Sequence, residues 1–293
     1  IGNDQEFHEA LHKCRQFIHV HGVPFNRFLA HLDLPELKKA GLNIDVDGNF
    51  AVAESLISSD RLFTFEGFVR RGKTVIYGVV ESLREGRAAS SLSRYHYPAD
   101  LDLDHREKGC KILEKVLKRF GFDNGPFNAE FFLNSQSGDL ALLEINPRIS
   151  KSHSPLFHMV DGASHHRQAI RLALGLKPAL PDGSGRNAMA SKFMIRSTEG
   201  DGIVKRVPTK SEIEELRRIL PDFEAAVLVN ENDRLSDLPD QDSYSYEIMD
   251  VFLGGNSHDM IEEFPFDVME EENIEIPVTD GLSLAARIWR PVQ

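Results

Sequence analysis

The sequence predicts an α+β fold with antiparallel sheets and flanking helices, followed by a small β-rich lobe. Two pairs of strand-like segments support this, because each is rich in β-branched and aromatic residues and is joined by a short turn: 62–72 with 73–82, and 127–133 with 140–146. Between the two pairs, apolar residues recur at helical spacing over 104–120. Of the 293 residues, 41% are hydrophobic and 27% are charged, so the chain can bury a core of ordinary size.

The elements of the first half follow from the same periodicities. A helix is expected over residues 4–18, a break at 22–24, and a strand over 50–57. In the central helix, Asp104 is the expected N-cap and Gly121 the expected end.

The second half continues with a helix over 162–175 and a Pro- and Gly-rich linker over 177–185. Beyond the linker we expect two strands, a helix and a further strand, over residues 188–196, 202–208, 211–220 and 225–229. The expected organisation has three parts, over residues 1–178, 186–268 and 274–293.

Charge and cysteine content exclude several classes of protein. The chain carries 34 Lys and Arg against 46 Asp and Glu, a net charge of −12. Such a surface repels phosphate backbones and anionic lipid, so neither nucleic acid nor a membrane is expected as a partner. Cys14 and Cys110 lie far apart and form no metal-binding pair; the expected setting is reduced and cytoplasmic. No apolar run approaches ~18 residues, so no membrane span is expected.

Polar side chains that suit a metal ion gather in the second strand pair. Glu144, Asn146 and Arg148 are spaced two apart and share a face if the strand continues, while Glu130 lies on the facing strand. Directly opposed Cβ atoms are ~5 Å apart, so Glu130 can meet Glu144 and Asn146. Carboxylate and amide oxygens suit Mg²⁺ or Mn²⁺, and an arginine suits phosphate or carboxylate. The alternative is that these residues are merely solvated at strand ends.

The stretch FNAEFF, a polar turn and LLEINPRIS together resemble the ATP-grasp family, whose signature pairs an acidic strand residue with E-x-N-x-R. The resemblance covers residues 1–178 and implies a partial ATP-grasp fold. It makes Glu130 and Glu144 the acidic metal ligands and Asn146 the amide ligand. It makes Arg148 the arginine that steadies the transferred phosphoryl group or acyl phosphate.

Residues 52–69 resemble the family's adenine-binding strand and the strand after it. By this resemblance Glu54 lies beside adenine, and Ser55, Leu56 and Ile57 supply backbone contacts. The resemblance implies an ATP-dependent ligase that activates a carboxylate as an acyl phosphate for attack by an amine or similar nucleophile. It also implies ATP and Mg²⁺ (or Mn²⁺) as cofactors, small-molecule carboxylate and amine substrates, and a homodimer as the candidate assembly.

Some positions depart from the family pattern. Arg61 or Leu62 stands where the family carries a glutamate that contacts ribose, and Ser152 stands where bicarbonate-using relatives carry a catalytic glutamate. His153 either lines the phosphoryl or acceptor site as a catalytic residue or is an ordinary hydrogen-bonded histidine. The family's lysines and glycine-rich phosphate loop precede the helix with which this chain begins, so we expect the 293 residues alone to be inactive.

The segment IPVTDGLSLAARIWRP resembles the opening hairpin of X-prolyl dipeptidyl peptidase and cocaine-esterase type α/β-hydrolases. A hairpin turning at Asp280-Gly281 is expected, and by the resemblance residues 274–293 begin a truncated hydrolase domain. No nucleophile elbow follows in the sequence. The alternative function is therefore a degenerate ATP-grasp binding or structural module attached to a hydrolase (peptidase or esterase).

Overall fold

The computed structural model describes residues 3–32, 34–39, 41, 47–54, 57–84, 92–178, 183–197, 200–220, 222–239, 241, 245–257, 261, 269–278 and 282–291. The chain divides into two compact units, Ile1–Leu56 and Ile57–Gln293.

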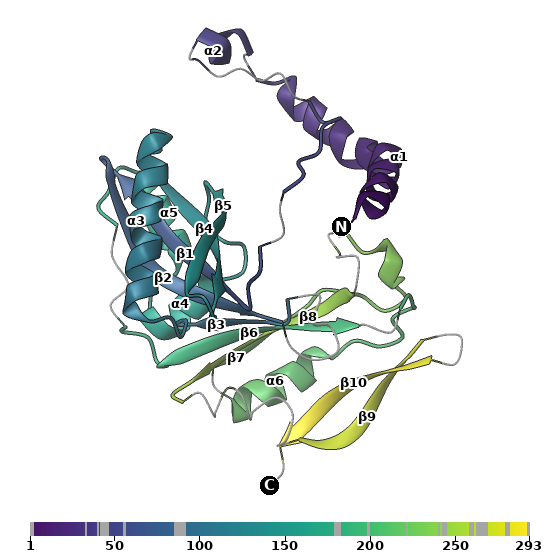
Figure 1. The fold of residues 1–293 in the computed structure, drawn as a ribbon. Coiled ribbons are helices and arrows are strands. Elements are labelled where there is room, and N and C mark those ends of the chain that lie inside the picture. The colour runs from purple at the N-terminus through teal and green to yellow at the C-terminus, as the bar shows by residue number, and fades with distance from the viewer. Residues whose placement is uncertain are drawn as a thin grey trace. The chain divides into compact units, whose positions relative to one another are not determined.

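The first unit contains a long helix, α1 (Asp4–Leu29), drawn in purple in Figure 1. It begins after Asn3, whose side chain accepts a hydrogen bond from the backbone N–H of Glu6. The expected break near residue 22 is wrong, because Pro24 lies inside the helix. A proline removes one backbone donor, but its fixed φ suits a helix, so this helix continues through it at a cost.

A short helix, α2 (Leu34–Lys39), follows in the same unit. The strand expected over 50–57 is wrong where it is described, because residues 50–54 and Ile57 belong to no strand and Val52 is 86% exposed. An apolar period of two favours a strand only where a neighbouring strand completes the ladder of hydrogen bonds.

The second unit is built on one eight-stranded sheet in which every neighbouring pair is antiparallel (Figure 1). Its spatial order is β5-β4-β1-β2-β3-β6-β8-β7. The strands are β1 (Arg61–Arg70), β2 (Lys73–Leu83), β3 (Arg94–Tyr97), β4 (Gly125–Asn134), β5 (Asp139–Asn146), β6 (Met189–Ser197), β7 (Phe223–Val227) and β8 (Tyr246–Gly255). Both predicted strand pairs are confirmed, as is the α+β class.

The sheet is continuous across the expected linker, because β3 pairs with β6. β8 has no counterpart among the predicted elements. The strand expected over 202–208 is reduced to one isolated bridge between Ile203 and Arg234. The three-part division of the chain stays a prediction.

The helices of this unit are α3 (Leu103–Arg119), α4 (Ser154–Asp161), α5 (His165–Ala173) and α6 (Lys210–Ile219), with a 3₁₀ turn, η2 (Leu235–Asp237). The central predicted helix is confirmed as α3, but its cap is Asp102 and not Asp104. The Asp102 side chain accepts from the backbone N–H of His105 at 3.0 Å. α4 was not predicted, because its eight residues are too few to show a clear helical period.

Alternate residues of β1 face two different helix layers. Phe63 and Phe65 are fully buried and pack with Leu113 and Leu117 of α3. Glu66 points to the opposite face of the sheet, since successive side chains alternate. On that face a second core gathers buried apolar side chains from α4 and α5. One face of the sheet therefore carries an apolar layer, and the other carries polar groups beside a second core.

A separate two-stranded sheet pairs β9 (Met269–Val278) with β10 (Leu282–Pro291). The expected hairpin is confirmed, although its first strand begins at Met269, before residue 274. The turn at Asp280-Gly281 lies outside the described residues. Within the part of the chain that is described, no helix is both long and apolar enough to cross a membrane.

Candidate functional site

Three predicted metal ligands meet on the β4–β5 hairpin. Glu130 pairs directly with Glu144, and Asn128 pairs with Asn146. Residues two apart on a strand share a face, and opposed residues across a ladder lie side by side. The structure therefore brings Glu130, Glu144 and Asn146 together.

This pairing depends on an irregularity in β5. The ladder pairs Phe131 with Leu142 but Glu130 with Glu144, so Leu143 is an extra, bulged residue. Without the bulge Leu143 would oppose Glu130, and Glu144 would turn to the other face, because a one-residue shift exchanges the two faces. The bulge is what sets the two carboxylates on one face, and strict alternation from the turn does not predict it.

The electrostatics of the hairpin favour a cation. Burial raises the pKa of Glu130 above its usual range, and the negative charge of Glu144 raises it further, whereas Arg148 lowers it. Asn146 donates from Nδ2 to Glu144 Oε1 at 2.6 Å. Two carboxylates and an amide oxygen form a donor set that fits Mg²⁺ or Mn²⁺. No group of three or more His, Cys, Asp or Glu suited to a metal occurs among the described residues. The third ligand of this donor set is therefore the amide oxygen of Asn146.

Arg148 lies just past the end of β5 and is exposed. Its backbone N–H donates to the carbonyl of Asn146 at 2.8 Å, which folds the chain back at the strand end. Its guanidinium makes a longer contact of 3.3 Å with the carbonyl of Ile149. A planar guanidinium beside two carboxylates suits the oxygens of a phosphoryl or acyl phosphate group.

His153 does not face solvent. It is 3% exposed at the N-terminus of α4, and its Nδ1 lies 2.9 Å from Glu66 Oε1. The same Glu66 oxygen accepts from Asn128 Nδ2 at 2.8 Å. The histidine thus reaches the hairpin through Glu66 and Asn128. This geometry suits the hydrogen-bonded interpretation of His153, and a catalytic role for it stays a prediction.

Glu66 is a residue that the sequence analysis missed. Burial raises the pKa of this fully buried carboxyl, but its contacts with His153 and His165 outweigh burial and lower the pKa to about 2. The His165 contact is an ion-pair distance of 3.6 Å to Oε2. A glutamate within the apolar segment LFTFEGFV was the available signal, because a buried charge needs partners.

A second missed group borders the loop after β5. Lys192 of β6 is 4% exposed, lies 2.9 Å from Asp250 Oδ1, and donates to Ser152 Oγ at 3.3 Å. Burial raises the pKa of Tyr95 on β3 to about 12, and the charge of Glu130 adds to this shift. Strands β3 and β6 therefore lie close to the hairpin site.

The adenine-binding segment is described only in part. Ser55 and Leu56 lie outside the described residues. Glu54 belongs to the first compact unit and Ile57 to the second, and both are exposed. Their assignment to adenine stays a prediction.

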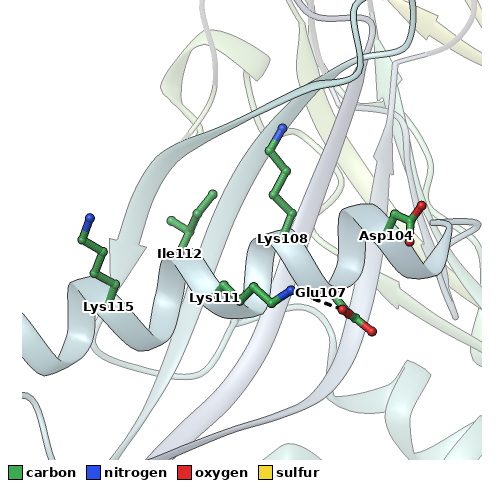
Figure 2. A pocket seen from close by; sticks show the side chains of 6 residues that line it. All are labelled: Asp104, Glu107, Lys108, Lys111, Ile112 and Lys115. Atoms are coloured by element: carbon green, nitrogen blue, oxygen red, sulfur yellow. Dashed lines mark hydrogen bonds and ion pairs between the residues drawn. The ribbon is translucent and has the colours of Figure 1, made fainter.

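A pocket of about 420 Å³ lies along the outer side of α3, and Figure 2 shows its lining side chains spread over successive turns. Glu107 and Lys111 pair there at 3.4 Å. Since α3 packs on the face of the sheet opposite Glu130, this pocket is separate from the candidate site. Its lining residues are Asp104, Glu107, Lys108, Lys111, Ile112 and Lys115.

Solved structures share the fold described above, which is an α+β ATP-grasp fold. The L-amino acid ligase from Bacillus licheniformis aligns with a TM-score of 0.56 and 16% identity, covering 71% of this chain and 52% of that one. Phosphoribosylglycinamide synthetase from Anaerococcus prevotii aligns with a TM-score of 0.53 and 16% identity, covering 71% and 51%. The predicted partial ATP-grasp fold is confirmed.

Sequence comparison matches part of the chain to a known family. Residues 100–180 match the family described as carbamoyl-phosphate synthase L chain, ATP binding domain. The carbamoyl phosphate synthase large chain of Pasteurella multocida (strain Pm70) is 37% identical over 60 residues, 20% of this chain and 6% of that protein. The large chain of Ralstonia nicotianae (strain ATCC BAA-1114 / GMI1000) is 28% identical over 161 residues, 53% and 14% respectively. This chain therefore spans a small part of these relatives and about half of the solved structures.

Proposed function

We propose that this chain supplies the metal- and phosphate-binding part of an ATP-dependent ligase, which activates a carboxylate as an acyl phosphate for attack by an amine or similar nucleophile. The observation that carries the proposal is the direct pairing of Glu130 with Glu144, beside Asn146, on one face of the sheet. The family match over residues 100–180 contains all three residues and supports the same interpretation.

Each residue of the hairpin has a distinct part in this proposal. Glu130, Glu144 and Asn146 would hold Mg²⁺ or Mn²⁺, and the ion would supply positive charge to offset the negative charge that moves during phosphoryl transfer. Arg148 binds the oxygens of the transferred phosphoryl group and of the acyl phosphate. His153 holds Glu66 in place and acts on the site through it.

The reaction has two displacements. An oxygen of the substrate carboxylate attacks the γ-phosphorus of ATP, and ADP leaves. The amine nitrogen then attacks the acyl carbon, the C–N bond forms, phosphate leaves, and the nitrogen loses a proton. Glu54 and the backbone of Ser55, Leu56 and Ile57 hold the adenine. Catalysis of this kind depends mainly on positioning and on electrostatic stabilisation.

The test replaces the hairpin residues in the full natural polypeptide and measures phosphate release from ATP with Mg²⁺ and a panel of amino acids. Glu144→Gln and Glu130→Gln keep the shape but remove a charge, so turnover should be abolished while the melting temperature stays the same. Asn146→Ala should have a milder effect. Arg148→Lys should impair turnover, because lysine lacks the planar fork.

Lys111→Ala on the outer side of α3 is the matched control and should leave turnover unchanged. Solvated strand-end residues would give surface-like effects within about 0.5 kcal/mol, so near-normal turnover in Glu144→Gln would contradict the proposal. Absence of turnover in the unaltered full polypeptide would favour the degenerate binding module. The same assay on the 293 residues alone tests the prediction that they are inactive.

A further inference from the structure

A chain of side-chain hydrogen bonds joins the buried centre of the sheet to the candidate metal site. Glu66 Oε1 accepts from Asn128 Nδ2 at 2.8 Å and is 2.9 Å from His153 Nδ1. Asn128 Oδ1 accepts from Asn146 Nδ2 at 3.4 Å, the longest link. Asn146 Nδ2 also donates to Glu144 Oε1 at 2.6 Å.

The chemistry of these groups fixes which one donates and which one accepts in each hydrogen bond. An ionised carboxylate accepts hydrogen bonds and donates none, so Asn128 must present its NH₂ to Glu66. The carbonyl oxygen of Asn128 is thereby turned toward Asn146. Asn146 in turn must present its NH₂ to Asn128 and Glu144, which leaves its own Oδ1 without a role in the network.

This orientation matters for a hard cation. Mg²⁺ and Mn²⁺ bind the oxygen of an amide and not its nitrogen. The two ends of an asparagine amide are nearly equal in shape, so packing alone does not choose between them. If the Asn146 amide were flipped, its NH₂ group would face the cation, and Asn146 would no longer serve as a ligand.

We infer that Asn128 and Glu66 are positioning residues of the candidate metal site, which fix the amide of Asn146 so that its oxygen is available to a divalent cation. The inference rests on the proposed function, since it presumes that Asn146 is a ligand. It adds that the ligand's orientation is set from inside the protein, by a carboxylate with no exposed surface.

A merely structural role for Glu66 makes a different prediction. If Glu66 only neutralises His153 and His165 in the interior, its replacement lowers the free energy of unfolding but leaves metal affinity unchanged. If it orients Asn146, metal affinity falls even in variants that remain folded. The two roles therefore separate in a binding measurement on folded protein.

The experiment measures binding of Mn²⁺ alone to the full chain by electron paramagnetic resonance. Asn128→Ala removes the middle link and leaves the Glu66 carboxylate itself in place, and we expect Mn²⁺ affinity to fall by about 10- to 100-fold, as for other groups that orient metal ligands. Glu66→Met, which has similar length but no acceptor oxygen, should do the same. Glu66→Gln keeps an acceptor oxygen for Asn128 and His153, so its affinity should match that of the unaltered chain.

The outcomes separate this inference from the proposed function. Mn²⁺ binding that survives Glu144→Gln would overturn the metal site itself, and the inference with it. Binding that is lost in Glu144→Gln but unchanged in Asn128→Ala would overturn only the inference. Equal weakening in Glu66→Gln and Glu66→Met would also overturn it, because charge and not hydrogen-bond direction would then be responsible. If Glu66→Met does not fold, Asn128→Ala decides.

Discussion

Glu66 combines full burial with an ionised carboxylate, a combination that requires compensation. An isolated charge in the interior is costly, and such groups persist only when they are paired and hydrogen-bonded. Here the partners come from three elements: Asn128 of β4, His153 at the start of α4, and His165 of α5. Glu66 therefore ties two helices to the strand that carries Glu130.

The pH dependence of stability should reveal this carboxylate. Folding lowers the pKa of Glu66 from 4.5 to about 2. Its contribution to stability is therefore fully present above 4.5 and is lost as the pH falls toward 2. Between about pH 6 and about pH 3, the free energy of unfolding should fall more steeply in the unaltered chain than in Glu66→Gln, with a difference on the order of 3 kcal/mol at most.

Urea unfolding followed by circular dichroism at each pH gives these free energies. Other carboxyls with lowered pKa values, such as Asp60, Asp102 and Asp201, titrate in both proteins. The difference between the two curves therefore belongs to Glu66 and to its contacts with His153 and His165. Parallel curves would show that Glu66 is not held ionised by folding.

Some site residues are predicted from neighbouring positions in the sequence, whereas others depend on contacts between distant positions. Glu144 and Asn146 are predicted from local alternation and motif spacing, since both belong to one strand. Glu66 is not, because its partners lie 62 to 99 positions further along the chain and only the fold brings them near. The bulge at Leu143 is likewise not predicted, because it depends on the register with β4.

At the scale of elements, α3 lies close against β1 because Gly109 has no side chain. A Cβ at this position would come within 2.6 Å of Cζ of Phe65. Phe65 has no exposed surface, and its ring packs at a tilt against that of Phe131, with centroids 4.8 Å apart. The ring therefore has little room to move, and the helix and the sheet meet at a fixed distance.

Gly109→Ala should lower the stability of the chain. Alanine favours the helix by about 1 kcal/mol relative to glycine, but overpacking of a tight core costs about 1–3 kcal/mol. We expect the second effect to dominate, seen as a lower urea midpoint. In a Phe65→Leu background, the smaller side chain leaves room and the penalty of the alanine should disappear. A higher midpoint for Gly109→Ala alone would show that the ring yields.

The elements themselves show why prediction succeeds in some segments and fails in others. The two strand pairs and α3 are predicted because their turns and periodicities are local. Residues 50–54 have the apolar pattern of a strand, but no strand pairs with them among the described residues. α1 passes through Pro24, where a propensity rule predicts a stop. For residues 50–54, the deciding interaction is pairing with a neighbouring strand, which the segment's own sequence does not contain.

At the scale of the whole molecule, the two sheets differ in the interactions that stabilise them. The eight-stranded sheet is covered by apolar cores on both faces, which include side chains from α3, α4 and α5. β9 and β10 pair with each other and, within the described residues, with no other strand. A two-stranded hairpin is only marginally stable by itself in water. The hairpin should therefore unfold independently of the rest of the second unit.

The hairpin carries its own probe, because Trp289 of β10 is the only tryptophan in the chain. In urea, the change in its fluorescence should come at a lower concentration than the loss of far-ultraviolet circular dichroism from the large sheet, since independent units do not share one transition. A chain that ends at residue 268 should melt within about 2 °C of the full chain, given that 1 kcal/mol shifts the melting temperature by about 2–4 °C at this size. Coincident transitions, together with a loss of several degrees on truncation, would mean that the hairpin packs against the ATP-grasp part of the chain. That result would contradict the prediction that residues 274–293 begin a truncated hydrolase domain.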